Sequence, residues 1–214
     1  DILAGAAFAA DEDGGGAALR DAADEVDDVA HGLGLADEVV DAEAGAAFAD
    51  VGAVTWGNGA SGSAGLVGST NSWVGTQLSD RVGSAGITPL TNGNYVFGSP
   101  VWKSGTVAVG AATWAPGSAS SNGAVSSANS LVGSTFQDIV GDFTNIRALT
   151  NGNYVVITPN WDAPGITNAG AITWGNGTTG ISGAISSSNS RIGATAEDRL
   201  GSNGLTRLPN GNYV

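Results

Sequence analysis

Leu90-Thr-Asn-Gly-Asn-Tyr-Val96 is the stretch that decides the fold. It recurs at 149–155 and, with Pro in place of Thr, at 208–214, so that the copies start 59 residues apart. A fixed period of this size is typical of a repeat architecture, in which each unit is one supersecondary block stacked on its neighbours. We therefore expect three such units in residues 51–214.

This motif predicts an antiparallel hairpin, because both central residues of a type I′ turn need positive φ and Asn-Gly supplies them. We expect a strand over Ile87–Leu90, a turn over Thr91–Asn94 and a second strand over Tyr95–Gly98. A second hairpin is expected from Ala53–Trp56, through a Gly/Ser-rich turn, to Leu66–Ser69. Each unit would then hold about four short strands, which is one antiparallel sheet or one propeller blade.

Other features recur once in each unit. They are the Trp of a Gly-Ala-x-Thr-Trp strand (Trp56, Trp114, Trp174), an Asn-Ser pair that begins at Asn71, Asn129 or Asn189, and an acid (Asp80, Asp138, Asp198). Counted from the Trp strand, the three β repeats run over about 51–109, 110–169 and 170–214, after a segment of different composition at 1–50.

The fold class expected is all-β, built from four-stranded antiparallel units that resemble β-propeller blades. A β-solenoid is the alternative, because each unit also divides into three coils with Asn and Thr in ladders. Hairpins at fixed positions favour blades, since hairpins pair antiparallel whereas solenoid coils pair in parallel.

Residues 1–50 form an acidic Ala/Asp/Gly-rich segment. It holds 14 of the 20 acidic residues and one of the seven basic ones, so it carries the whole net charge of −13. Little apolar surface and strong self-repulsion favour a disordered or marginally helical state. A helix packed on the repeats and a decayed repeat at 28–50 are the alternatives. With no basic stripe, a nucleic-acid partner is not expected.

Composition sets further bounds. Cysteine is absent, which excludes disulfides and thiol metal sites. No apolar run approaches the ~20 residues of a membrane helix, so no membrane insertion is expected. The chain begins at Asp1 without a signal pattern, and we expect it to be a processed or excised fragment.

Catalytic residues are scarce. The single histidine, His31, falls in the acidic segment and is expected to be a solvated surface residue. The recurrent Asp80, Asp138 and Asp198 are expected to accept main-chain N–H bonds and pin a turn. The chain is therefore predicted not to be an enzyme, and neither catalytic residues nor a cofactor is expected.

Ligand-binding candidates come from two residue types. An aromatic platform for sugars would use Trp73, Trp102 and Trp161, while the Trp of the recurrent strand is expected in the core between units. Asn71, Asn129 and Asn189 could bind sugar hydroxyls, although Asn and Ser also close turns on their own backbone.

The order of these motifs resembles the FG-GAP blade of integrin-α-type β-propellers. The positions that carry the resemblance are Val82-Gly83, Val96–Pro100, Gly110–Trp114, Val140-Gly141, Val155–Pro159 and Gly170–Trp174. In that family, Asp-rich loops often bind Ca²⁺. Here those loops are 91–94, 150–153 and 209–212, and they contain no carboxylate for a hard cation. The Asn-Gly-Asn-Tyr-Val repeat is also similar to arrays in large bacterial surface proteins that are haemagglutinin-like, which implies a cell-surface or adhesive role.

The leading functional hypothesis is a non-enzymatic extracellular or cell-surface module for adhesion to, or interaction with, a protein or glycan. Asn-, Ser-, Thr- and Trp-rich turns with little charge suit weak multivalent contacts. The alternatives are a structural spacer or a self-assembling surface filament of copies of the chain itself. A glycan-active enzyme on a propeller scaffold ranks last, because no paired carboxylates are evident.

Overall fold

The chain is described by a computed structural model that covers residues 39–40 and 47–214. Throughout these residues the backbone forms strands, turns and loops, which confirms the predicted all-β class. The same ranges contain no helix that could cross a membrane. The predictions for His31, and most of those for the acidic segment 1–50, concern residues outside the described ones.

The strands are short. They are β1 (Val39–Val40), β2 (Ala47–Phe48), β3 (Ala53–Thr55), β4 (Ser72–Val74), β5 (Ile87–Pro89), β6 (Tyr95–Ser99), β7 (Lys103–Ser104), β8 (Val107–Ala108), β9 (Ala111–Ala115), β10 (Gly123–Ala124), β11 (Ser130–Val132), β12 (Ile146–Ala148), β13 (Tyr154–Thr158), β14 (Ala171–Gly175), β15 (Gly183–Ala184) and β16 (Ser190–Ile192).

Three units follow one another along the chain. The second unit is the antiparallel series β5, β6, β9 and β11, and the third unit is the same series made by β12, β13, β14 and β16. Of the first unit, the structure describes the antiparallel pair of β3 and β4, and the separate antiparallel pair of β1 and β2 precedes it. The predicted repeat is therefore confirmed.

The predicted hairpin is confirmed as well, since β5 pairs with β6 around the turn at 91–94. The predicted type I′ turn was wrong, because Gly93 has a φ of 88° but Asn92 is not among the residues with positive φ. Asn92 instead closes the turn with its side chain, whose Oδ1 accepts from the N–H of Asn94 at 3.1 Å.

The second predicted hairpin was wrong in its partner strand. β3 pairs with β4, so that Val54 lies opposite Trp73, and it does not pair with Leu66–Ser69. One reason is a hydrogen bond between side chains at one end of the pair. The hydroxyls of Thr55 and Ser72 lie 2.7 Å apart across β3 and β4, whereas Leu66 is in an exposed loop.

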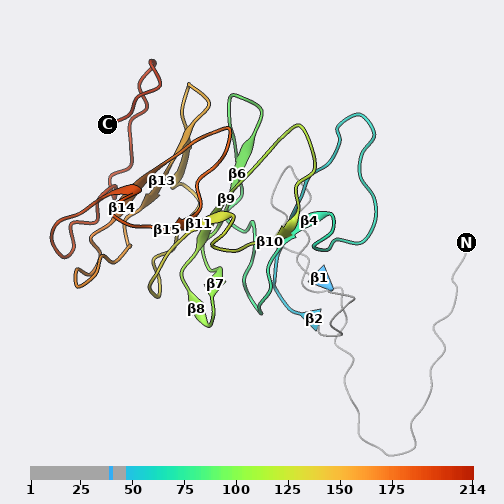
Figure 1. Cartoon of the computed structure of the whole chain (residues 1–214), viewed down its shortest axis with the longest axis horizontal. Helices are drawn as coiled ribbons and strands as arrows, with labels where there is room; N and C mark the ends of the chain where they lie inside the picture. Colours follow the sequence, from blue (N-terminus) through green and yellow to red (C-terminus); the bar gives the residue numbers. More distant parts are fainter. Residues whose placement is uncertain (1–38, 41–46) are drawn as a thin grey trace, which may run out of the picture.

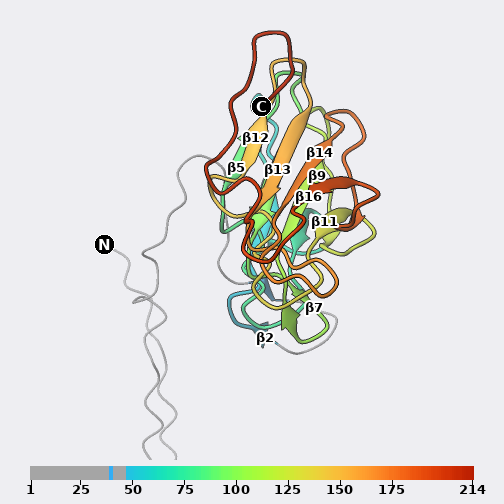
Figure 2. The same ribbon diagram turned by 90° about the vertical axis from the view of Figure 1, so that its left-hand side faces the viewer.

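The second and third units each contribute one strand to the sheet of the preceding unit, and this strand joins the two units. The second unit's β10 pairs in parallel with β4, and the third unit's β15 pairs in parallel with β11. Figure 1 shows the resulting row of units along the long axis of the molecule, and in Figure 2, turned by 90°, the strands of successive units overlie one another.

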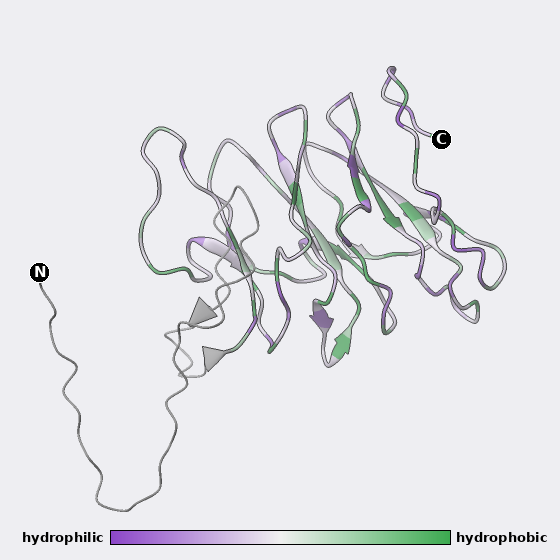
Figure 3. Cartoon of the chain, turned by 180° about the vertical axis from the view of Figure 1, so that it is seen from behind, coloured by the Kyte–Doolittle hydropathy of each residue, from purple (hydrophilic) through white to green (hydrophobic). Residues whose placement is uncertain are grey.

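The hydrophobic core lies between the units, because successive side chains of a strand point to opposite faces. In β13, Tyr154 and Val156 pack towards the second unit, whereas Val155 and Ile157 belong to a separate cluster with Leu205 and Tyr213. Figure 3 shows the hydrophobic (green) stretches running through the central strands. The sheet of the second unit, with β5, β6, β9 and β11, is thus buried on both faces by its neighbours.

The turns of the hairpins form a ladder along the row. Thr91 Oγ1 donates to the carbonyl of Thr150 at 3.5 Å, and Thr150 Oγ1 donates to the carbonyl of Pro209 at 3.3 Å. Asn151 Nδ2 donates to the carbonyl of Gly211 at 3.2 Å. The last turn belongs to a third copy of the hairpin at 205–214, closed by main-chain bonds between Thr206 and Val214.

Candidate functional site

The asparagines of the Asn-Ser pairs hold turns. Asn71 Oδ1 accepts from the N–H of Gly68 at 3.0 Å, and its Nδ2 donates to the carbonyl of Leu66 at 2.7 Å. Asn129 and Asn189 make the same two bonds in the other units. The amide groups proposed for sugar hydroxyls are therefore occupied by their own backbone.

The three tryptophans predicted as a platform lie in the core. Trp73, Trp102 and Trp161 are only 8, 5 and 2% exposed. Trp102 and Trp161 each follow the Ser/Thr-Pro bend at the end of β6 or β13, as expected, but the loop folds their rings inward between two units. The flat faces of these rings are not open to a ligand.

Two of the three tryptophans of the recurrent strand link one unit to the next. The expectation that all three lie in the core was wrong for Trp174, which is 43% exposed. Trp56 Nε1 donates to the carbonyl of Gly117 at 2.9 Å, and Trp114 Nε1 donates to the carbonyl of Gly177 at 3.0 Å. Asn92 and Asn94 donate to that same carbonyl, each at 2.8 Å. The amide groups of the turn at 91–94 are thus committed to contacts between units.

The recurrent aspartates pin turns, as predicted. Asp80 Oδ2 accepts from the N–H groups of Thr76 and Gln77, each at 2.9 Å, and its Oδ1 accepts from the N–H of Lys103 in the second unit at 3.1 Å. Asp138 and Asp198 repeat the turn. Within the described ranges, no three His, Cys, Asp or Glu side chains come together in a way that could hold a metal ion.

The pKa values of two of these carboxyls should lie on opposite sides of the ordinary pKa of an aspartate. Burial raises the pKa of Asp80, and its main-chain hydrogen bonds and the charge of Lys103 oppose this. Hydrogen bonds from the hydroxyl and N–H of Thr195 and from the N–H of Ala194 lower the pKa of the exposed Asp198. We expect carboxyl ¹³C shifts in an NMR titration to give a higher midpoint for Asp80 than for Asp198.

The consequence for stability differs in sign. Asp198 stabilises the fold above the pKa of the unfolded chain, and this contribution is lost as the pH falls through its lowered folded pKa. Asp80 acts in the opposite sense, because its raised pKa means that the folded state binds a proton more tightly than the unfolded chain does. Its contribution to stability is present below the pKa of the unfolded chain and is lost as the pH rises through the raised folded pKa. Equal midpoints, or the reverse order, would contradict the assigned environments.

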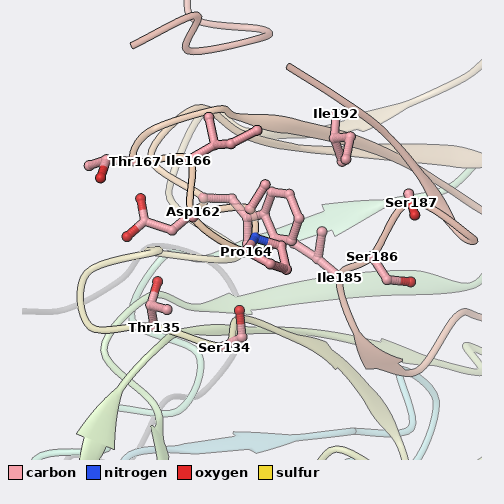
Figure 4. A pocket seen from close by; sticks show the side chains of 13 residues that line it. Ser134, Thr135, Asp162, Pro164, Ile166, Thr167, Ile185, Ser186, Ser187 and Ile192 are labelled. Carbon is pink, nitrogen blue, oxygen red and sulfur yellow. The ribbon is translucent and has the colours of Figure 1, made fainter. Parts of the chain in front are cut away.

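A groove of about 500 Å³ opens beside the Trp161 loop, where the second and third units meet. Figure 4 shows Ser134 and Thr135 of the second unit across this groove from Ile166 and Ile192 of the third. Its apolar lining comes from Trp161, Ala163, Pro164, Ile166, Ile185 and Ile192, and its polar lining from Ser134, Thr135, Asp162, Thr167, Ser186 and Ser187.

The loop after Trp161 explains why the groove forms at this junction. In the second unit, Lys103 reaches back to the first unit, where its Nζ donates to the carbonyl of Leu78 and lies 4.0 Å from Asp80 Oδ1. Asp162 takes that position in the third unit. Its side chain accepts from the N–H of Asn168 at 2.7 Å, within its own loop. No long side chain from position 162 therefore crosses the junction.

One known repeat family matches this chain. Its description is a repeat of unknown function (DUF5650), and it matches residues 42–84, 89–142 and 148–202. The chain belongs to this repeat family. The second and third DUF5650 repeats run from the Asn-Gly hairpin to just beyond the Asp turn, so they follow the sheets of the structure. No curated protein and no solved structure matches the chain.

Sequence reasoning missed the groove in these DUF5650 repeats. Ile166 and Pro164 belong to no recurrent motif, and Ile185 stands where the second unit has Val125. One signal was available. The segment from the buried Trp to the Gly of the next strand is one residue longer in the third unit (161–170) than in the second (102–110). A loop that differs among otherwise regular repeats is a natural place for a specific site.

Proposed function

We propose that the chain is a non-enzymatic interaction module that binds a protein ligand at the groove beside Trp161. The observation that carries this proposal is the lining of the groove, with an apolar floor and a rim of hydroxyls and one carboxylate. A volume near 500 Å³ with mostly apolar walls and a few polar groups is typical of ligand pockets. The three turn-forming aspartates are all engaged by main-chain N–H groups, which leaves no carboxylate pair among them for hydrolysis.

A protein ligand fits this groove better than a glycan. Sugars stack on the open face of an aromatic ring, and Trp161 is 2% exposed. Ile166 and Ile192 are only partly covered, so an apolar side chain of a partner would bury them further. Asp162 and the serine and threonine hydroxyls would then bond the main chain on either side of that side chain.

The wider setting belongs to the same proposal. We place the module at the cell surface or outside the cell, in an adhesive role, on the resemblance to bacterial surface arrays and to FG-GAP blades. The antiparallel series of β12, β13, β14 and β16 supports blade-like units. The β-solenoid remains the rival, because the parallel pairs β4–β10 and β11–β15 join consecutive units.

Ile166→Asp is expected to weaken ligand binding roughly 10- to 100-fold, because it replaces one buried aliphatic contact with a charge. The probe is a library of phage-displayed peptides panned on the immobilised chain, with a glycan array screened in parallel. Enriched peptides should share an apolar residue, and their affinity is measured by fluorescence anisotropy.

Val107→Asp is the matched control, because Val107 is a partly exposed residue in the corresponding loop of the second unit. It should leave peptide binding unchanged. Glycan binding without peptide binding would favour the glycan alternative. Equal loss in the two variants would show that the groove is not the site.

A further inference from the structure

The junction between the first and second units is spanned by two long side chains. Lys103 of the second unit crosses to the first, where its Nζ donates to the carbonyl of Leu78 and lies 4.0 Å from Asp80 Oδ1. Gln77 of the first unit reaches the other way, and its Nε2 donates to the carbonyl of Lys103 at 3.3 Å. A primary ammonium therefore lies between a main-chain carbonyl and a buried carboxylate at this junction.

The junction between the second and third units has the same main-chain frame. Asp138 Oδ1 accepts from the N–H of Asp162 at 3.2 Å. The equivalent bond at the first junction, from the N–H of Lys103 to Asp80 Oδ1, is 3.1 Å long. Lys103 and Asp162 thus hold equivalent positions. The carbonyl of Phe136, two residues before Asp138, corresponds to the carbonyl that accepts from Lys103, and position 162 supplies no ammonium for it.

The long side chains of the first junction are replaced by short ones at the second. Thr135 stands in the place of Gln77, and Asp162 stands in the place of Lys103. Both replacements line the groove beside Trp161. The groove therefore lies where long side chains, one of them cationic, span the first junction.

The charge beside the groove is negative. Asp138 is 1% exposed, and of the described residues that line the groove Asp162 alone is charged. Neither carboxylate takes part in an ion pair with a described residue. Thr135 Oγ1 donates to Asp138 Oδ1 at 2.6 Å, which supplies a hydrogen bond but no positive charge. A cation that enters the groove is favoured, because charges held away from water attract each other strongly.

We propose that the partner protein inserts a lysine side chain into this groove, with its ammonium between the carbonyl of Phe136 and the carboxylate of Asp162. This inference rests on the proposed function and specifies the chemistry of the protein ligand. The methylene groups of a lysine suit an apolar lining, since they can be buried while the ammonium stays at a polar edge. Lysine is favoured over arginine because the group at the first junction is a compact ammonium, not a planar fork.

The groove has room for this lysine beside the apolar side chain proposed above. In Figure 4, Asp162 and Thr135 lie at the left of the groove, whereas Ile185 and Ile192 lie at the right. The ammonium and the apolar side chain of the partner would thus occupy different ends. The partner segment is therefore expected to carry a lysine near an apolar residue.

The probe is the set of phage-displayed peptides that the immobilised chain enriches. Each peptide should contain a lysine near its apolar residue. Acetylation of that lysine removes its charge and keeps its carbon chain. The affinity measured by fluorescence anisotropy should then fall about tenfold, the effect of losing a hydrogen bond to a charged group.

Asp162→Asn removes the charge of the groove and keeps an oxygen that can accept from the N–H of Asn168. It should weaken binding of the lysine peptide about fivefold, the upper range for an exposed ion pair, and binding of the acetylated peptide less. Asp142→Asn is the matched control. Asp142 also accepts one neighbouring main-chain N–H, from Phe143 at 2.9 Å, but it does not line the groove. This variant should leave both affinities unchanged.

Asp162→Lys tests the equivalence of the two junctions. Its side chain should take the path of Lys103 and fill the groove, so that the lysine peptide and the acetylated peptide both bind at least about tenfold more weakly. Undiminished binding of either peptide to this variant would show that the groove is not the space that Lys103 fills at the first junction, and would overturn the lysine proposal.

The remaining outcomes separate this proposal from the proposed function. Ile166→Ser is used here beside Ile166→Asp, because it removes the apolar contact without adding a charge. A library that yields no binder, or peptides whose binding ignores Ile166→Ser, would overturn both proposals. Peptides that depend on Ile166 but lack a lysine, or that bind equally well after acetylation, would overturn the lysine proposal alone.

Discussion

Trp161→Ala should lower the free energy of unfolding by about 3–5 kcal/mol, the usual cost of removing a large aromatic side chain from a core. Trp161 is 2% exposed and packs in the cluster that contains Leu90, Tyr154 and Ile185 from two units. Its loss leaves a cavity at the junction that rigid strands on both sides cannot fill. Chemical denaturation followed by circular dichroism gives the change directly.

Trp174→Ala is the matched control, because Trp174 is 43% exposed. It should cost no more than about 1 kcal/mol, since little apolar area leaves water there on folding. A Trp161→Ala protein that keeps its stability but loses ligand binding would restore the platform hypothesis for Trp161. That result would contradict the assignment of Trp161 to the core.

Gly141→Ala is the second change expected to have a large effect, at about 3–5 kcal/mol. Gly141 has a φ of 83°, in the left-handed region that L side chains avoid. A Cβ on Gly141 would lie 2.2 Å from the carbonyl oxygen of Ala111 and 3.1 Å from Cα of Gly98. Main-chain atoms surround the site, so strain and overlap add.

Gly86→Ala separates these two causes. Gly86 has a similar φ of 78°, but a Cβ there would meet nothing within 4 Å. Its substitution should cost only the backbone strain, about 1–2 kcal/mol. Thermal unfolding of the two variants provides the comparison, and equal losses would mean that the contact between Gly141 and Ala111 contributes little.

Local signals were enough to predict the repeat and its main hairpin. Asn92 and Gly93 fix the turn between β5 and β6 locally, because Gly93 takes the positive φ of 88° and the side chain of Asn92 accepts from the N–H of Asn94. The partner of β3 could not be found in this way. It depends on Thr55 and Ser72, 17 residues apart in the chain, and on β10, which comes from the following unit.

The site was less accessible to sequence reasoning than the fold. Trp102 and Trp161 follow a bend and would be exposed in an isolated unit, but each packs in a core shared by two units. The groove depends on the directions of the Lys103 and Asp162 side chains. These directions differ, although the two residues hold equivalent positions in their units. A single repeat pattern averages over such differences and therefore hides them.

The ladder of hairpin turns has an evolutionary consequence. Thr91, Thr150 and Pro209 are joined in sequence at intervals of 59 residues. Recombination that removes or duplicates one full period would bring an equivalent turn into the vacated position, whereas a deletion of any other length would leave the turns out of step. Whole units could therefore be gained or lost without disturbing the ladder, whereas the interval between successive hairpin turns is constrained.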